Sequence, residues 1–132
     1  MDTSHQNRKT IFLLEDDESF SLIFAIWIEE AGYALARAKN ITQAKEKLAT
    51  IPPPDLFWLD YYLGEEKEGG MDFFRWLKGQ ELYRNIPAIV VSITADAEKL
   101  KEFENEGVRR ALSKTVANRE TIVATAKEIL GS

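Results

Sequence analysis

The stretch LFWLD, residues 56–60, decides the fold. Its four apolar residues do not alternate with polar ones, which is typical of a parallel strand buried on both faces of a sheet. A second stretch of this kind, IFLL at residues 11–14, is followed directly by the four acids of residues 15–18. Two buried strands that each end in an acid predict a parallel sheet with carboxylates gathered at one edge.

Short strands and helical patterns alternate on both sides of these two stretches. Further strands are expected over residues 34–38, 88–91 and 108–112. Amphipathic helices are expected over residues 19–31, 41–51, 73–77, 96–106 and 118–130, and residues 64–70 are expected to form a loop. The predicted fold is therefore α/β and flavodoxin-like: a doubly wound (βα)5 parallel sheet of five strands with helices on both faces, in three α/β/α layers.

Composition limits the class of protein. The chain has 132 residues, 45% of them apolar, no cysteine and a net charge of −5, so we expect one globular domain over residues 10–130 after a polar tail over residues 1–9. Without cysteine there is no disulfide scaffold and no thiolate metal site. The acidic balance argues against direct nucleic-acid binding. With neither a membrane span nor a secretory signal visible, we expect a cytoplasmic protein that does not bind membranes.

The predicted strands deliver reactive side chains to one edge of the sheet. These side chains are Glu15, Asp16 and Asp17 after the first strand, Asp60 after the third, Ser92 at the fourth, and Ser113 and Lys114 at the fifth. Clustered carboxylates suit a hard cation, and Mg²⁺ is the usual one in cells. An aspartate beside that cation stays ionised and can act as a nucleophile, and a lysine with a hydroxyl can hold the oxygens of a transferred phosphoryl group.

The net charge is concentrated in the same place. Residues 15–18 carry −4 and residues 60–68 carry −3, so the rest of the chain is +2. A divalent cation at this edge would relieve the repulsion among the acids.

Four stretches together resemble the receiver domain of two-component response regulators, the CheY-like superfamily. They are IFLLED at 11–16, PDLFWLD at 54–60, IPAIVVS at 86–92 and ALSK at 111–114. The resemblance implies that Asp60 is the phosphoacceptor. It also implies an Mg²⁺ site in which Asp16 binds directly, Glu15 acts mainly through water and the Tyr62 carbonyl is a further ligand. Asp17 is the alternative to Asp16 as the direct Mg²⁺ ligand if the match to the family's acidic pair is shifted by one residue.

The same resemblance assigns the other side of the site and the partners. Ser92 takes the position of the Ser/Thr hydroxyl, in preference to Thr94, because it lies 22 residues before Lys114. Lys114 would contact the acyl phosphate. The implied donor is a sensor histidine kinase or a histidine phosphotransfer protein, and an unknown downstream protein is the target. Such a domain catalyses its own phosphorylation and dephosphorylation and is not otherwise an enzyme.

Several residues depart from the pattern of this family. Thr115 replaces a proline that follows the lysine in a cis bond, and we expect a trans peptide because a cis bond without proline costs about 2.5–4 kcal/mol. Ala111 replaces the aromatic switch residue, so the usual coupling to a ring is absent. Ile93 replaces a small residue and narrows the access to Asp60. The loop that contains residues 65–68 is longer than usual, and the ring of Tyr62 would shield the acyl phosphate.

The first helix carries a candidate partner surface. We expect Phe20, Ile23, Phe24, Trp27 and Ala31 to face inward and Leu22 and Ile26 to face outward, with Ala25 beside them. Because exposed apolar patches often mark partner sites, Leu22 and Ile26 are candidates for contact with the phosphodonor. The alternative is that they are scattered surface residues of no special role.

Two other functions remain open from the sequence. One is a degenerate receiver that binds proteins without being phosphorylated, which Ala111, Thr115 and Ile93 favour. The other is a small phosphohydrolase on a similar fold. Hydrolases that use an aspartate nucleophile commonly carry a second Asp two residues later, and here that position is Tyr62.

Overall fold

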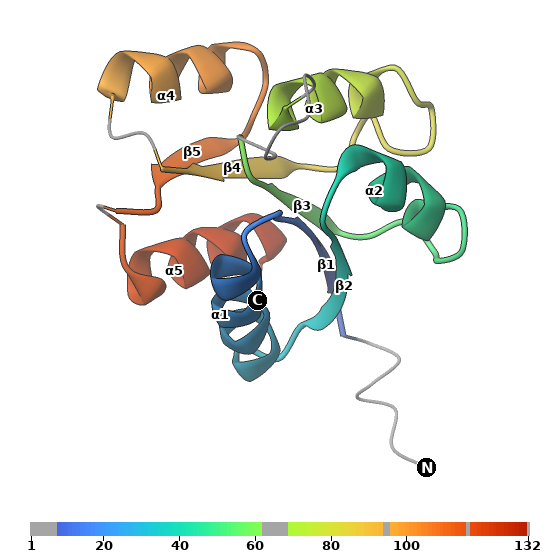
Figure 1. Ribbon diagram of the computed structural model, residues 1–132, viewed down its shortest axis with the longest axis horizontal. Coiled ribbons are helices and arrows are strands. Elements are labelled where there is room, and N and C mark those ends of the chain that lie inside the picture. Colours follow the sequence, from blue (N-terminus) through green and yellow to red (C-terminus); the bar gives the residue numbers. More distant parts are fainter. Residues whose placement is uncertain (1–7, 62–68, 94–95, 116, 132) are drawn as a thin grey trace.

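A single parallel sheet forms the centre of the protein, in a computed structural model that describes residues 8–61, 69–93, 96–115 and 117–131. Its strand order is β2-β1-β3-β4-β5 (Figure 1). The strands are β1 (Thr10–Leu14), β2 (Ala34–Ala38), β3 (Leu56–Leu59), β4 (Ala88–Ser92) and β5 (Arg110–Ser113). The helices are α1 (Glu18–Glu30), α2 (Ile41–Leu48), α3 (Gly70–Lys78), α4 (Ala97–Asn105) and α5 (Arg119–Leu130).

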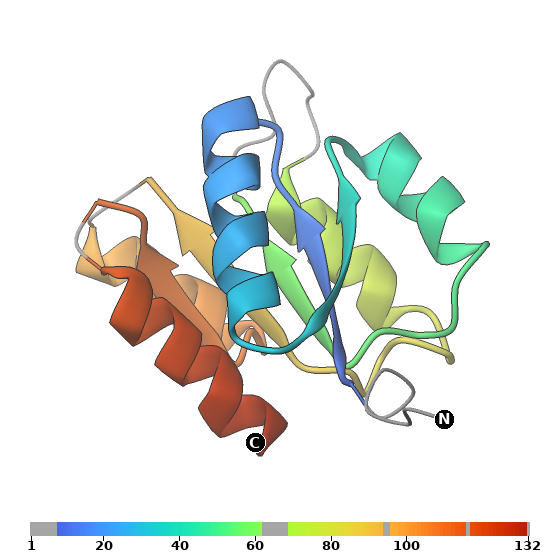
Figure 2. The same cartoon turned by 90° about the horizontal axis from the view of Figure 1, so that it is seen from below.

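Helices cover both faces of the sheet, which confirms the predicted flavodoxin-like fold. Figures 1 and 2 show α1 and α5 on one face and α2, α3 and α4 on the other. Each face has its own core. Phe24, Ile28 and Ile122 pack on the α1/α5 side with Trp58, whereas Phe73, Phe74 and Phe103 pack on the opposite side with Phe57.

β3 is the middle strand of the sheet and β1 lies next to it. Their apolar residues from Ile11 to Leu14 and from Leu56 to Leu59 are at most 1% exposed, as expected for strands that are covered on both faces. The register pairs Leu14 with Leu59, so the residues that follow these two strands leave the sheet side by side. All strands run parallel, but β2 is added on one side of β1 and β3 on the other. Ligands bind at the point between β1 and β3 where the strand order reverses in this way.

Three element boundaries differ from the sequence expectations by two residues or more. The last strand begins at Arg110 rather than residue 108, and Val108 is buried in the preceding turn. Helix α2 ends at Leu48, so Ile51 lies beyond it. Gly70 was expected in a loop but is the first residue of α3, where a Cβ would overlap the carbonyl oxygen of Asp60. Glycine is therefore required for α3 to begin this close to β3.

The predicted inward face of α1 is right in part. Phe24 is buried and Phe20, Trp27 and Ala31 pack against the core as expected, but Ile23 and Ala25 lie on the opposite sides from those predicted. Ile23, which was expected inside, is 41% exposed, and Ala25 is buried. The buried stripe is Ser21, Phe24, Ala25 and Ile28. The small side chains of Ser21 and Ala25 let the helix approach the sheet on that side, which turns the larger Ile23 toward solvent. Within the described ranges, every helix is too short or too polar to cross a membrane.

Candidate functional site

The candidate site lies where β1, β3, β4 and β5 end. The Asp60 amide donates to the Leu14 carbonyl oxygen at 2.9 Å, and the Lys114 amide donates to the Ser92 carbonyl oxygen at 2.6 Å. These bonds continue the hydrogen-bonding pattern of the sheet one residue beyond the ends of β3 and β5. The backbone therefore places Asp60 beside Glu15, and Lys114 beside Ser92.

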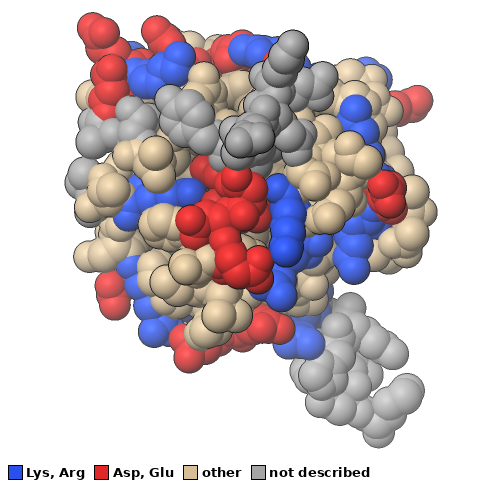
Figure 3. Space-filling view, in the orientation of Figure 1, with Lys and Arg blue, Asp and Glu red and all other residues tan. Residues whose placement is uncertain are grey.

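Three carboxylates converge at this edge. One oxygen each from Glu15, Asp16 and Asp60 lie within 4.8 Å of one another. Glu15 and Asp60 are 1% and 4% exposed, while Asp16 is half-buried. Figure 3 shows acidic side chains gathered near the middle of this face, over the start of α1 and flanked by basic ones. Oxygen ligands in this number and spacing fit a hard divalent cation such as Mg²⁺.

Lys114 is the basic group of the cluster. Its Nζ lies 2.8 Å from Glu15 Oε1 and 3.2 Å from Asp60 Oδ1, and its side chain is only 2% exposed. The predicted meeting of Glu15, Asp16, Asp60 and Lys114 is thus seen in the structure. A single lysine leaves the three carboxylates with an excess of negative charge.

The environment of Asp60 disfavours its charged form. Burial is the main cause and raises the pKa of Asp60 to about 8. This raised pKa of Asp60 includes a smaller upward contribution from the charge of Glu15, which Lys114 partly offsets. A divalent cation would add positive charge beside the carboxylate and so return Asp60 to the ionised state that a nucleophile needs.

The structure separates the roles of Asp16 and Asp17, which the sequence left open. Asp17 is the N-cap of α1, and its Oδ1 accepts a hydrogen bond from the Phe20 amide at 2.8 Å. The Asp17 amide in turn donates to Glu15 Oε2 at 3.2 Å. Asp17 therefore stabilises the start of the helix, and Asp16 is the residue that joins the carboxylate cluster.

Ser92, the residue expected to supply the hydroxyl of the site, is the last residue of β4. Ser92 is fully buried, and the register pairs it with Ser113 on β5. Ile93, the next residue, is 54% exposed, so its effect on access to Asp60 stays a prediction. Thr94, Tyr62 and the acidic loop over residues 65–68 lie outside the described residues.

The loop after β5 is held together by two hydroxyls in place of a proline. The peptide between Lys114 and Thr115 is trans, as predicted. The Thr115 amide donates to Ser113 Oγ at 3.2 Å, and the two hydroxyl oxygens lie 3.0 Å apart. Short local bonds of this kind fix turns, so they orient the backbone from which Lys114 projects.

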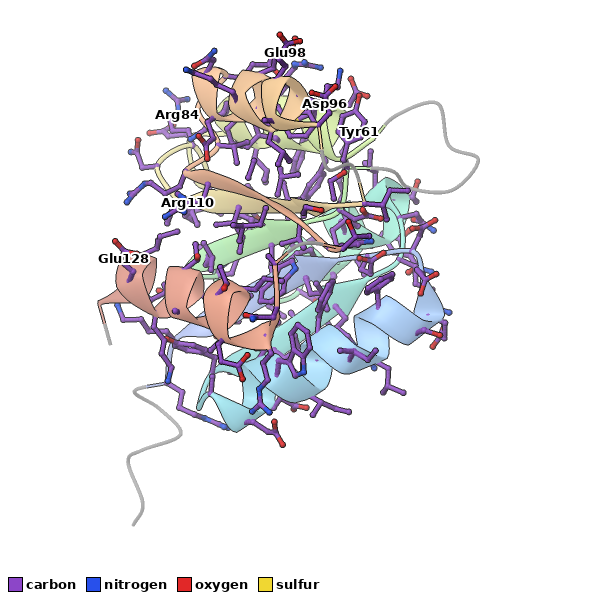
Figure 4. The ribbon with its side chains drawn as sticks, turned by 90° about the vertical axis from the view of Figure 1, so that its left-hand side faces the viewer. Tyr61, Arg84, Asp96, Glu98, Arg110 and Glu128 are labelled. Atoms are coloured by element: carbon purple, nitrogen blue, oxygen red, sulfur yellow. The ribbon has the colours of Figure 1, made fainter. Side chains whose placement is uncertain are left out.

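Aromatic side chains approach the site from both faces of the sheet, and sequence reasoning missed these contacts. Lys114 Nζ lies 4.5 Å from the ring centroid of Phe20. On the other face, Tyr61 packs on Phe103 of α4 with ring centroids 4.7 Å apart, and Figure 4 shows Tyr61 near the start of that helix. Phe20 follows the N-cap Asp17 by three residues, a signal that could have placed it in the first turn, at the edge of the site.

Ala111 has no ring to offer on β5. Its amide donates to Glu104 Oε2 of α4 at 3.1 Å, and Arg110 lies 4.0 Å from the same carboxylate oxygen. In this structure β5 is thus linked to α4 through one glutamate.

The outward face of α1 carries more apolar surface than predicted. Leu22 and Ile26 are 55% and 47% exposed, as expected. Ile23, which is 41% exposed, joins them. We refer to Leu22, Ile23 and Ile26 as the α1 surface.

Comparisons with known proteins agree with this geometry. The response regulator receiver domain family matches residues 11–127. The polar-differentiation response regulator DivK of Brucella anthropi is 30% identical over 123 residues, which cover 93% of this chain and 97% of that protein.

Solved structures show the same fold. The signal receiver domain of a signal transduction histidine kinase from Syntrophus aciditrophicus is 26% identical, with a TM-score of 0.79 over 93% of this chain and 90% of that one. The receiver domain of Francisella response regulator 1452 is 18% identical, with a TM-score of 0.82 over 94% of this chain and 98% of that one. The family match and the identity to DivK agree with the meeting of Glu15, Asp60 and Lys114 at one edge of the sheet. This chain therefore belongs to the response regulator receiver domain family.

Proposed function

We propose that Asp60 accepts a phosphoryl group from the phosphohistidine of a sensor histidine kinase or a histidine phosphotransfer protein. The observation that carries this proposal is the meeting of Asp60 with two further carboxylates and the Lys114 ammonium at one strand edge. A carboxylate oxygen of Asp60 attacks phosphorus, the bond between phosphorus and the imidazole nitrogen breaks, and that nitrogen keeps the electron pair. No metabolite is turned over, so the domain is not an enzyme in that sense.

Glu15, Asp16 and Asp60 are the described residues that would hold Mg²⁺, and the Tyr62 carbonyl is a further expected ligand. When bound, Mg²⁺ supplies positive charge to the oxygens of the group in transfer. Lys114, already in contact with Asp60, is placed to shift its ammonium onto a phosphoryl oxygen. The Ser92 hydroxyl would donate a hydrogen bond to another phosphoryl oxygen. Phosphoryl transfer needs chiefly positioning and neutralised charge, which this set of groups supplies.

Phosphorylation would then shift the equilibrium between two conformations of the surface, and a downstream protein would bind one of them better. Without a ring at Ala111, this shift cannot use an aromatic side chain on β5. The α1 surface is the proposed contact for the phosphodonor, because it is apolar, exposed and lies on the helix that begins at the site. We place the protein in the cytoplasm, where such donors act.

A decisive experiment follows the mass of the intact protein with acetyl phosphate, with and without Mg²⁺. The proposal requires an added phosphoryl group that depends on Mg²⁺ and is absent in Asp60→Asn. The trans peptide before Thr115 and the small Ala111 favour a second candidate, a module that binds partners without phosphorylation. Absence of both an adduct and Mg²⁺ binding would support that module, and steady hydrolysis of added phosphate esters would support a phosphohydrolase.

A further inference from the structure

The ammonium of Lys114 is enclosed on one side by an aromatic ring. Lys114 Nζ lies 4.5 Å from the ring centroid of Phe20, in the first turn of α1. The same nitrogen contacts Glu15 Oε1 at 2.8 Å and Asp60 Oδ1 at 3.2 Å. With the lysine side chain only 2% exposed, this cation is held between two carboxylates and a ring, away from water.

The ring of Phe20 is itself well supported. It packs on Phe24 at 5.5 Å between centroids, and Phe24 packs on Trp58 of β3 at 5.0 Å. The Phe20 amide is bound to the N-cap Asp17 at 2.8 Å. Both the backbone and the side chain of Phe20 are therefore fixed, so the ring offers the lysine a preformed surface.

The contact suits a cation that must exchange its partners. An aromatic face attracts an ammonium through its quadrupole, and the attraction grows when both groups are removed from water. The ring accepts no conventional hydrogen bond and leaves the N–H donors of Lys114 for oxygen acceptors. A third carboxylate in place of the ring would hold the lysine more firmly and compete for those donors.

We propose that Phe20 is a positioning residue for phosphoryl transfer. Its ring holds the Lys114 ammonium within reach of Asp60 and lets the ammonium move from the carboxylate to a phosphoryl oxygen without leaving the ring. The role in transfer rests on the proposed function of Asp60, whereas the contact itself does not.

The contact is tested first in the metal-free protein by NMR. A ring above the ammonium shifts the Lys114 Hε protons upfield through the ring current. This shift should be present in the wild type, lost in Phe20→Leu and kept in Phe20→Tyr. Equal Hε shifts in the wild type and Phe20→Leu would overturn the proposal, whether or not Asp60 is phosphorylated.

The role in transfer is tested by the rate of phosphorylation with acetyl phosphate and saturating Mg²⁺. Because Phe20 is half-buried, Phe20→Leu should lower this rate about fivefold to thirtyfold, the range between an exposed and a desolvated cation–π contact. Phe20→Tyr should restore the rate to within about twofold, because it keeps the ring. A Phe20→Leu protein as fast as the wild type would overturn the role.

Trp27→Leu is the matched control. Trp27 lies on the same helix and also packs on Phe24, at 5.4 Å between centroids, but its ring is not the one over Lys114. The phosphorylation rate of Trp27→Leu should stay at the wild-type value. An equal loss of rate in Trp27→Leu and Phe20→Leu would overturn the proposal, because it would show a general effect of repacking. If Phe20→Leu does not fold, Phe20→Met takes its place with the same expected losses. A wild type without any adduct would refute the proposed function, and the NMR measurement would still decide the contact.

Discussion

The excess of negative charge at the site predicts an unusual dependence of stability on pH. Burial and Glu15 raise the pKa of Asp60 to about 8 in the folded, metal-free protein. The unfolded chain releases this proton near pH 4. Between about pH 4 and 8 the folded state therefore binds more protons, and the free energy of unfolding falls as the pH rises through this window.

The size of the effect follows from the shift. About four pKa units at about 1.4 kcal/mol each set an upper limit on the order of 5 kcal/mol. Asp60→Asn keeps the shape of the side chain without its charge. At pH 8 in EDTA, this variant should exceed the wild type by about 3–5 kcal/mol in the free energy of unfolding, and at pH 5 the difference should shrink to about 1–1.5 kcal/mol.

Urea unfolding followed by tryptophan fluorescence measures these values from pH 5 to 8.5. Glu128→Gln, which removes one exposed acid on α5, is the matched control and should follow the wild type. Adding Mg²⁺ at pH 8 should restore much of the lost stability to the wild type and less to Asp60→Asn. A wild-type stability that stays constant or rises with pH, or an Asp60→Asn protein less stable than the wild type at pH 8, would refute the reasoning.

Three further predictions concern single groups of the site and its surroundings. Asp17→Ala should cost about 1 kcal/mol of stability through the lost helix cap and leave Mg²⁺ affinity unchanged. Asp16→Asn should weaken Mg²⁺ binding without a loss of stability. Unfolding curves measure the first effect, and Mg²⁺ titrations measure the second. Lys114→Met should slow phosphorylation by acetyl phosphate at least tenfold while the protein still binds Mg²⁺, and an unchanged rate measured by mass would contradict its role. Replacing Leu22 and Ile26 by serine should slow transfer from the cognate donor and leave the reaction with acetyl phosphate unchanged; unaltered kinetics with the donor would exclude the α1 surface.

The sheet and the ends of its strands were predictable because local pattern determines them. Unbroken apolar runs such as LFWL indicate buried parallel strands, and the residue after each run must then lie at the carboxyl edge. The positions of Glu15 and Asp60 follow from that rule alone, whereas Lys114 lies two residues beyond the weaker strand expected over residues 108–112. Their mutual distances could not be predicted, because these depend on register and side-chain rotamers.

The orientation of α1 shows where pattern reasoning fails. A stripe chosen for its large apolar residues placed Ile23 inside, but Ser21 and Ala25 are buried instead because small side chains allow close packing. Phe20 over Lys114 and Tyr61 on Phe103 join residues far apart in sequence. Periodicity within one helix contains no information on such pairs.

The most direct test of the central claim is to locate the modification. The protein is phosphorylated with acetyl phosphate and Mg²⁺, and the digested peptides are compared by mass before and after hydroxylamine, which cleaves acyl phosphates. We predict one phosphoryl group, labile to hydroxylamine, on the peptide that contains Asp60. A phosphoryl group on another residue, or one that persists in Asp60→Asn, would contradict the proposal that Asp60 is the phosphoacceptor.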